Sequence, residues 1–354
     1  MMSFRKELRG PRRTLLTVLC LCFVGLSPLA AFAGPSHHAG EGFKNIYGNR
    51  DKGIGDFLKW RFERIGSDTP DPDDYHFPLA ENDPAFLQSN RNHTTATWVG
   101  HSTLLLQVKG KNILTDPHFS ERASPVQWAG PRRVAPPGIA LDDLPPIDVV
   151  LISHNHYDHL DVGTVERLAA REGGEETLFM VPLKMKSWFE DLGIEQVVEL
   201  DWWERHGVDD LDIQAVPMHH WSKRTLFATN DVLWAGWVVD SGDFRFIFLG
   251  DCGYSPVYRD LGEKLGPFDL AAIPIGAYEP RWFMRDQHVN PEEALQIHVD
   301  LRARKSIALH WGTFILTDEP LDEPPQRLMR GRAERGLSPG EFMILRHGET
   351  ILFE

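Results

Sequence analysis

Four side chains that can bind a metal ion lie within six residues, and this cluster constrains the fold of the chain more than any other feature. They are His154, His156, Asp158 and His159. The preceding residues 147–152 (IDVVLI) are rich in apolar and β-branched side chains, which predicts a short buried strand. Residues 162–171 have the pattern of a helix with Asp161 as its N-cap. The cluster therefore falls on a loop at the carboxyl end of a buried strand, where layered α/β proteins place their chemistry.

The spacing of these side chains predicts a two-metal site. In an extended loop, side chains two residues apart project to the same side, so His154 and His156 can converge on one ion. Asp158 and His159 then face a second ion. The alternative is a solvated polar turn that is rich in histidine, but this spacing favours the metal site.

A two-metal site needs further ligands, and three other strand-like runs each end in a His or Asp. The runs are residues 213–218, followed by His219 and His220; residues 244–249, followed by Asp251; and residues 306–309, followed by His310. The glycines that flank Asp251 allow close approach of the backbone to an ion, and its carboxylate can bridge two cations. A single histidine at a strand end is commonly a hydrogen-bonded core residue, but three such sites together favour a shared metal centre.

The first 33 residues have the features of an export signal. A basic region that includes Arg12 and Arg13 precedes an apolar stretch, and Ala31-Phe32-Ala33 forms a small-x-small cleavage pattern. Arg12-Arg13 is similar to a twin-arginine signal, with Sec export and a retained membrane anchor as alternatives. We therefore expect an exported protein, periplasmic or associated with the envelope, from which residues 1–33 are cleaved as a signal peptide.

The charge of the chain limits its partners. The net charge is −14 at pH 7, and loss of the five basic residues and one acidic residue in the first 33 would change it to −18. This acidity argues against nucleic acid as a partner, and any membrane contact should depend on a local patch. Cys252 would then be the only cysteine, which excludes an intramolecular disulfide. The oligomeric state stays open, with a homodimer as one alternative.

The rest of the chain divides into an arm, residues 34–91, and a domain, residues 92–354. The arm is rich in Gly, Pro, Asp and Asn, and we expect it to pack over the domain. Its residues 57–62 predict an amphipathic helix that either packs on the fold or contacts a membrane. In the domain we expect hairpins over residues 104–115, 232–249 and 342–353, and a helix that begins at Asn290-Pro291. This order of hairpins and strand–helix units predicts an α/β fold in which two sheets are covered by outer helices.

Several longer motifs lie between about residues 94 and 347. They are the segments 98–103 (WVGHST), 114–117 (LTDP), 144–148 (LPPID), 200–204 (LDWWE), 266–270 (GPFDL), 273–284 (IPIGAYEPRWFM) and 310–314 (HWGTF). Together these motifs resemble the N-acylphosphatidylethanolamine-hydrolysing phospholipase D family of the metallo-β-lactamase superfamily. The resemblance implies an αββα four-layer sandwich with an N-terminal extension, holding two zinc ions.

The resemblance also implies a role for each candidate ligand. His154, His156 and His220 would bind one zinc ion, Asp158, His159 and His310 the other, and Asp251 would bridge the two. His220 is preferred over His219 because the family places its ligand directly before the Trp that precedes a Lys-Arg pair. His288 matches a position near the active site and would act as an acid, a base or a phosphate contact. Cys252 departs from the family, which usually has threonine there.

The function implied by the resemblance is a zinc-dependent phosphodiesterase that releases phosphatidic acid and an N-acylethanolamine from a phospholipid at a membrane surface. Two zinc ions can activate a shared water and stabilise charge on the attacked phosphate. The alternatives are a lactonase or soluble phosphodiesterase of the superfamily, and a non-catalytic zinc- or lipid-binding envelope protein. The candidate substrate contacts are Lys223, Arg224, Tyr157 and Gln287, with Arg281 and Arg285 as further phosphate contacts and Trp282 and Phe283 as an acyl-chain entrance.

Overall fold

The computed structural model describes residues 1–2, 35–48, 53–66, 69–225 and 228–353. The chain divides into two units, Met1–Pro35 and Ser36–Glu354, and the helices and strands of the described residues all belong to the second. The predicted signal peptide, apart from its first two residues, lies outside the described residues. Among the residues that are described, no helix is long and apolar enough to cross a membrane.

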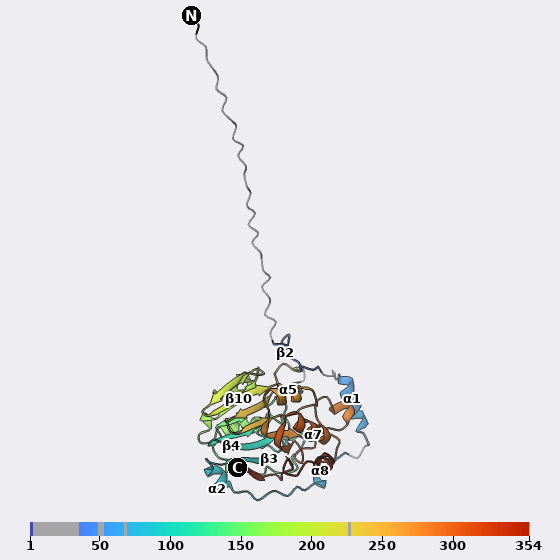
Figure 1. Ribbon diagram of the computed structural model, residues 1–354. Helices are drawn as coiled ribbons and strands as arrows, with labels where there is room; N and C mark the ends of the chain where they lie inside the picture. Colours follow the sequence, from blue (N-terminus) through green and yellow to red (C-terminus); the bar gives the residue numbers. More distant parts are fainter. Residues whose placement is uncertain (3–34, 49–52, 67–68, 226–227, 354) are drawn as a thin grey trace. The chain divides into compact units, whose positions relative to one another are not determined.

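Two seven-stranded sheets form the centre of the second unit (Figure 1). The first sheet is antiparallel from β16 to β5 and parallel from β5 to β8. Its order is β16 (Thr350–Phe353), β3 (Thr94–Gly100), β4 (Thr103–Val108), β5 (Lys111–Thr115), β6 (Val149–Leu151), β7 (Leu178–Pro182) and β8 (Val197–Leu200).

The second sheet also combines parallel and antiparallel strands. It is parallel from β15 to β12 and antiparallel from β12 to β9. Its order is β15 (Phe342–Met343), β14 (Ala303–Leu309), β13 (Phe268–Pro274), β12 (Arg245–Phe248), β11 (Gly236–Asp240), β10 (Leu211–Val216) and β9 (Arg205–Val208).

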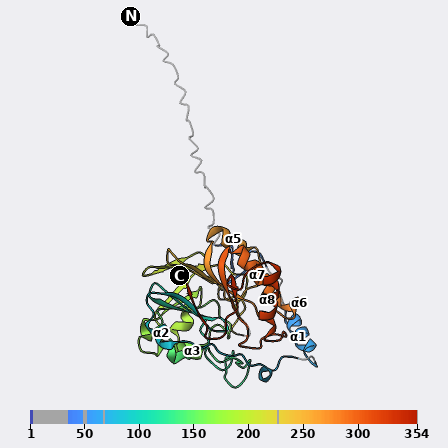
Figure 2. The same ribbon diagram turned by 60° about the horizontal axis from the view of Figure 1, so that its bottom comes forward.

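Alternation along the strands builds two cores. In β6, Val149 and Leu151 join the core between the sheets, whereas Val150 joins the core under the outer helices. Helices α2 (Pro84–Ser89), α3 (Val162–Ala169) and α4 (Lys186–Glu190) contribute to the outer core of the first sheet. Helices α5 (Val257–Lys264), α7 (Pro291–Asp300) and α8 (Glu323–Glu334) contribute to the core of the second sheet and lie together on the other side of the domain (Figure 2). This arrangement is the predicted four-layer sandwich.

Most of the predicted elements form, with one correction. The first two hairpins and the helix that begins at Asn290-Pro291 are present, and Asn290 and Glu293 make a reciprocal capping box. The predicted closing hairpin is wrong, because β15 pairs with β14 in one sheet while β16 pairs with β3 in the other. Asp161 is the N-cap residue of α3, as predicted, although its carboxylate accepts hydrogen bonds from Ser120 and the Thr164 hydroxyl and none from a backbone N–H of the helix.

The described part of the arm packs on the domain. It contains β1 (His38–Ala39), β2 (Gly42–Phe43), α1 (Ile54–Glu63), the short 3₁₀ turn η1 (Pro72–Asp74) and α2. Two further 3₁₀ turns, η2 (Leu141–Asp143) and η3 (Gly174–Glu176), lie in the domain. The Trp60 indole of α1 is buried, donates to Asp318 at 2.8 Å and stacks on Phe283 of α6 (Arg281–Met284) with ring centroids 5.2 Å apart. The amphipathic helix that the sequence predicts is therefore attached to the domain through one face.

Candidate metal centre

The predicted ligands meet because the strands that carry them end at the same edge of the sandwich. The loop after β6 carries His154 to His159, and Asp251 and His310 follow β12 and β14. Strand β10 is separated from β12 by one antiparallel neighbour, so it runs in the same direction and brings His220 to the same edge. The carboxyl ends of such strands are where open α/β sheets bind ligands.

One group of ligand atoms consists of His154, His156, His220 and Asp251, whose donor atoms all lie within 4.8 Å of one another. His156 Nδ1 is 2.8 Å from His154 Nε2 and 3.5 Å from His220 Nε2. Asp251 Oδ2 lies 3.9 Å from the Nε2 atoms of both His154 and His220. Three imidazoles and a carboxylate oxygen thus surround one point. The structure brings His220 rather than His219 to this group.

A second group contains Asp158, His159 and His310, together with His101. Asp158 Oδ2 is 3.4 Å from the Nε2 atoms of both His159 and His310. The Asp251 carboxylate reaches this group as well, because its two oxygens lie 3.1 Å from His159 Nε2 and 3.0 Å from His310 Nε2. Asp251 therefore faces both groups, as expected of a bridging carboxylate.

The hydrogen bonding of these atoms fits metal ligands. The buried Nε2 atoms of His159 and His310 and the buried Oδ1 of Asp251 make no hydrogen bond to any of the described residues. Buried polar atoms without partners are costly unless something else satisfies them. Lone pairs that converge on one place, from imidazole and carboxylate, suit a divalent cation such as Zn²⁺.

Burial and charge give the histidines different protonation behaviour. Burial lowers the pKa of His156 to about 4 and holds the pKa values of His154 and His220 well below the usual range. Burial acts in the same direction on His310, but the carboxylates of Asp251 and Asp158 together outweigh it and raise that pKa to about 9. The first group therefore presents neutral imidazoles, the form that binds a metal, while the carboxylates attract positive charge to the second group.

The ligands are held in place by neighbours that the sequence analysis did not assign. Asp116 accepts from His159 Nδ1 at 2.7 Å and from the Ser153 hydroxyl at 2.5 Å, and His101 Nε2 lies 3.1 Å from Asp158 Oδ2. Both Asp116 and His101 lie at the ligand edge, because β5 ends and the antiparallel β4 begins there. The sequence does contain a signal for both residues, because they lie in the motif segments 98–103 and 114–117, next to the ends of strands.

His288 lies beside the metal centre, with Nδ1 3.8 Å from Asp251 Oδ2 and its ring 5.4 Å from that of His220. Its side chain is 14% exposed, so it is reachable from solvent. Arg281 donates to the His288 carbonyl at 2.8 Å and pairs with Glu293, and the Gln287 carbonyl lies 2.9 Å from His220 Nδ1. The loop that carries His288 is thus fixed on both sides.

Two of the predicted substrate contacts support the ligand loop. Arg224 donates to the carbonyls of Asn155 and Leu160, and its guanidinium lies over the Tyr157 ring at 4.4 Å. Tyr157 in turn donates from its hydroxyl to the Arg224 carbonyl. Lys223 is half-buried and Arg285 is exposed, so these two side chains retain a surface on which a phosphate could bind.

The side chains of Trp282, Phe283 and Cys252 pack against other residues of the protein. Trp282 is half-buried under the Lys59 ammonium, which lies 4.1 Å from its ring centre, and Phe283 stacks on Trp60. Cys252 is fully buried, and burial raises the pKa of its thiol. Its sulfur belongs to none of the potential ligand groups formed by the described residues, so it packs as a small apolar side chain.

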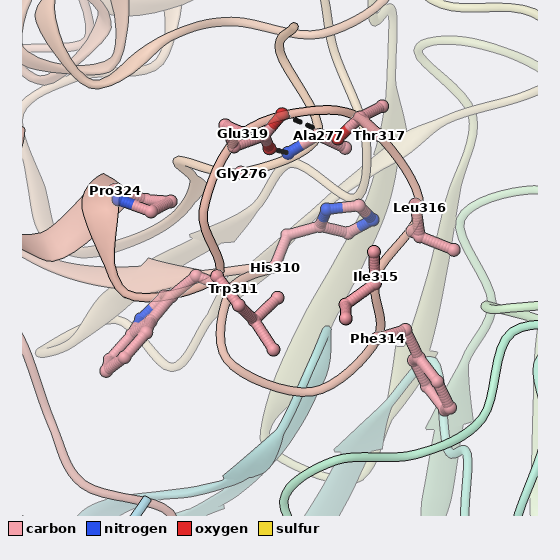
Figure 3. Close-up of a pocket in the computed structure, with 11 residues that line it drawn as sticks. Gly276, Ala277, His310, Trp311, Phe314, Ile315, Leu316, Thr317, Glu319 and Pro324 are labelled. Atoms are coloured by element: carbon pink, nitrogen blue, oxygen red, sulfur yellow. Dashed lines mark hydrogen bonds between the residues drawn. The ribbon is translucent and has the colours of Figure 1, made fainter. Parts of the chain in front are cut away.

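A small pocket lies next to His310 (Figure 3). Glu319 closes one side of it, where its carboxylate accepts from the backbone N–H groups of Ala277 and Glu279 and from the Thr317 hydroxyl. These bonds hold the segment after β13 against the segment after β14. The residues that line the pocket are Gly276, Ala277, His310, Trp311, Phe314, Ile315, Leu316, Thr317, Glu319, Leu321 and Pro324.

Comparisons with known proteins agree with this fold. Residues 111–311 match the beta-lactamase superfamily domain. The chain has a TM-score of 0.59 and 21% identity to an isothiocyanate hydrolase from Delia radicum gut bacteria, covering 73% of this chain and 99% of that one. It has a TM-score of 0.56 and 22% identity to a metallo hydrolase from Ignicoccus hospitalis, covering 74% and 99%. The protein is a metal-dependent hydrolase of the metallo-β-lactamase superfamily.

Sequence relatives narrow this class to a family. The chain is 44% identical over 267 residues to N-acyl-phosphatidylethanolamine-hydrolyzing phospholipase D 1 of Caenorhabditis elegans, covering 72% of this chain and 74% of that protein. It is 35% identical over 263 residues to the mitochondrial N-acyl-phosphatidylethanolamine-hydrolyzing phospholipase D of Saccharomyces cerevisiae, covering 72% of this chain and 55% of that protein. The chain belongs to the N-acylphosphatidylethanolamine-hydrolysing phospholipase D family.

Proposed function

We propose that this protein is a zinc-dependent phospholipase D that hydrolyses N-acylphosphatidylethanolamine-like lipids to phosphatidic acid and N-acylethanolamine. The observation that carries the proposal is the position of Asp251 between two groups of buried ligand atoms. Sites that hold two divalent cations suit phosphodiester hydrolysis, because charge develops on both the attacking and the leaving oxygen. The names of the 44% and 35% identical relatives support the choice of a lipid substrate.

The proposed roles of the residues follow from their positions. His154, His156 and His220 would hold one zinc ion, Asp158, His159 and His310 the other, and Asp251 both. The two ions would supply an activated water and stabilise negative charge at phosphorus. The water oxygen forms a bond to phosphorus, and the phosphorus–oxygen bond to the N-acylethanolamine breaks. The leaving oxygen takes up a proton.

We propose that His288 serves that leaving oxygen. Its ring is within 6 Å of the rings of His220 and His310, and the neighbouring backbone is clamped by Arg281. We assign it the role of a proton donor or phosphate contact. Lys223 and Arg285 are the cationic side chains that we assign to the lipid phosphate, since the guanidinium of Arg224 donates to backbone carbonyls.

Peripheral membrane contact would bring the lipid to this site. Helix α1 carries a stripe of exposed apolar side chains at helical spacing: Ile54, Leu58 and Phe62 are 75%, 58% and 76% exposed, and Ile65 beyond the helix end is 76% exposed. Lys59 and Arg61 lie on the same helix, as is common in interfacial helices. Helix α1 lies beside α6, and α6 leads directly to His288 (Figure 2).

A lipid assay tests the substrate. The protein would be incubated with mixed micelles of N-acylphosphatidylethanolamine, and the products identified by mass spectrometry, with Asp251→Asn as the inactive variant and His93→Ala, at an exposed histidine, as the control. We expect phosphatidic acid and N-acylethanolamine from the wild type and the control only. If the protein hydrolysed lactones or soluble phosphodiesters but no lipid, the proposed lipid substrate would be wrong. Lipid binding without any turnover would contradict an enzymatic role on lipids.

We propose, from the sequence of residues 1–33, that the protein is exported and that this segment is cleaved after Ala33. Expression in a bacterial host, followed by fractionation and N-terminal sequencing of the mature chain, tests this. A product that begins at Gly34 in the periplasmic or envelope fraction is the expected result. An uncleaved chain in the membrane fraction would indicate a retained anchor.

A further inference from the structure

A second set of potential ligands lies outside the metal centre. His37 Nε2 is 2.6 Å from one oxygen of the Asp201 carboxylate, and His38 Nε2 is 2.9 Å from the other. The donor atoms of the three side chains all lie within 4.8 Å of one another. None of the three belongs to the ligand groups that contain Asp251. Two imidazoles and a carboxylate therefore converge at a place that the proposed hydrolysis does not use.

The backbone holds these side chains in a defined arrangement. His38 pairs with Phe43 in the small β1–β2 hairpin, and the His37 carbonyl accepts from the Lys44 N–H at 2.9 Å. Asp201 directly follows β8, an edge strand of the first sheet, and its carboxylate also accepts from the Trp202 N–H. The site thus joins the arm to the sheet.

Aromatic packing fixes the orientation of both imidazoles. The His37 ring stacks on the buried Trp202 ring with centroids 4.3 Å apart, and the His38 ring meets the Phe43 ring edge-on at 5.1 Å. Ligands whose orientation is set before binding lose little entropy when a metal binds. The side chain of His38 is 36% exposed and that of His37 7%, so the cluster opens to solvent on one side only.

We propose that His37, His38 and Asp201 form a further metal site, separate from the hydrolytic centre, for a Zn²⁺-class transition-metal ion. Imidazole suits zinc, copper and nickel, and a carboxylate completes a common three-ligand set for zinc. Water from the side exposed at His38 fills the fourth position. The ion fastens the arm to the end of β8. The competing interpretation is a pair of imidazole–carboxylate hydrogen bonds without an ion.

The fastened segment reaches a ligand of the hydrolytic centre. Asn45, eight residues after His37, is buried, donates to the His220 carbonyl at 2.8 Å and accepts from the His220 N–H at 3.1 Å. Between them, Phe43 donates its N–H to the Asn230 carbonyl at 2.8 Å. A metal ion at the cluster would therefore stabilise the segment that holds the His220 backbone.

Metal content measures the proposed site directly. Wild type, His38→Ala, Asp201→Asn and the control His93→Ala would be stripped with a chelator, reloaded with Zn²⁺, desalted and analysed by mass spectrometry of the metal. We expect the wild type and control to retain one more zinc ion per chain than either cluster variant. Because His38 is partly exposed, its truncation should leave the fold intact, which circular dichroism checks. The measured quantity is the difference in zinc per chain between the wild type and the cluster variants. Because all of these proteins have the same hydrolytic centre, its own metal content does not affect this difference.

Hydrogen exchange provides a second measurement. Adding Zn²⁺ to stripped wild-type protein should slow amide exchange in residues 36–48, and the slowing should be lost in His38→Ala but kept in His93→Ala. Equal zinc content in the wild type and both cluster variants would overturn the proposal and leave hydrogen bonds as the function of the cluster. Loss of activity in Asp251→Asn with the extra ion retained would separate this site from the hydrolytic one.

Discussion

At the scale of single residues, the carboxylates around the metal centre have two different environments in this protein. Asp251 and Asp158 face converging imidazoles, and those imidazoles hold the carboxyl pKa values well below the usual range against the effect of burial. Asp116 lies behind them, where burial raises its pKa and His159 opposes that rise. Its contact with His159 Nδ1 leaves Nε2 directed at the metal centre.

Substitution of Asp116 should therefore weaken metal binding without removing a ligand. In Asp116→Asn, His159 loses an anionic acceptor, and we expect zinc affinity to fall by about 10- to 100-fold. Competition with a fluorescent chelator measures this, with Asp143→Asn at an exposed position as the control. Unchanged affinity would mean that Asp116 only contributes to the fold.

The buried His347 should make the folded protein less stable at acidic pH. Burial, and secondarily the nearby Arg133, lower the pKa of His347 to about 3, and its ring lies 4.2 Å from that of Trp98. The unfolded state, with an ordinary histidine pKa, binds more protons below about pH 6.5, so stability falls as the pH decreases toward 3. Between pH 7 and pH 5, protonation of this residue in the unfolded state should lower the free energy of unfolding by about 2 kcal/mol.

Urea denaturation at several pH values checks the contribution of His347. The His347→Gln variant should show a smaller loss of stability between pH 7 and pH 5 than the wild type, even if it is less stable at both. The exposed His93→Gln variant should retain the wild-type slope. Parallel pH profiles for all three proteins would contradict the assignment.

At the scale of elements, helix α1 has one face attached to the domain and one exposed apolar face. Trp60 attaches one face to Asp318 and Phe283, while the stripe that begins at Ile54 remains exposed. A helix attached in this way can present apolar side chains to a lipid surface without loss of the fold.

Charge placed on the exposed stripe should separate membrane contact from catalysis. The double variant Leu58→Glu, Phe62→Glu should bind lipid vesicles at least about 10-fold more weakly, because apolar burial supplies the binding energy. Its melting temperature should change little. Met329→Glu, on an exposed apolar residue of α8, is the matched control and should bind normally. Vesicle sedimentation measures the effect, and equal binding by both variants would exclude α1 as the contact.

At the scale of the whole molecule, the metal centre joins the two sheets. The loop after β6 belongs to the first sheet, whereas His220, Asp251 and His310 follow strands of the second. Ligands from both sheets that share an ion stabilise the folded state, because the unfolded chain does not assemble the site.

Metal removal should therefore lower the thermal stability. Stripping with a chelator is expected to reduce the melting temperature on the order of 5–10 °C, and zinc should restore it. Differential scanning calorimetry of the stripped, reloaded and untreated protein measures this, and stripped Asp251→Asn should gain less on reloading. Identical melting curves for stripped and reloaded wild type would show that the sheets do not depend on the centre.

The sequence by itself determined the local patterns of this protein. Short apolar runs indicated strands, because their spacing and β-branched side chains are readable without knowing the fold. The spacing of His154, His156, Asp158 and His159 indicated a metal loop, since residues two apart project together in an extended segment. The capping box at Asn290 and the amphipathic helix of the arm were equally local, and both form.

Only the tertiary structure decided which distant segments meet. The proximity of residues 342–343 and 350–353 in sequence suggested a hairpin, but packing assigned β15 and β16 to different sheets. The position of Asp251 between two ligand groups, the bond from Asp116 to His159 and the approach of Asn45 to His220 depend on strand direction and sheet packing. Contacts of this kind join residues far apart in the chain, so no local periodicity records them.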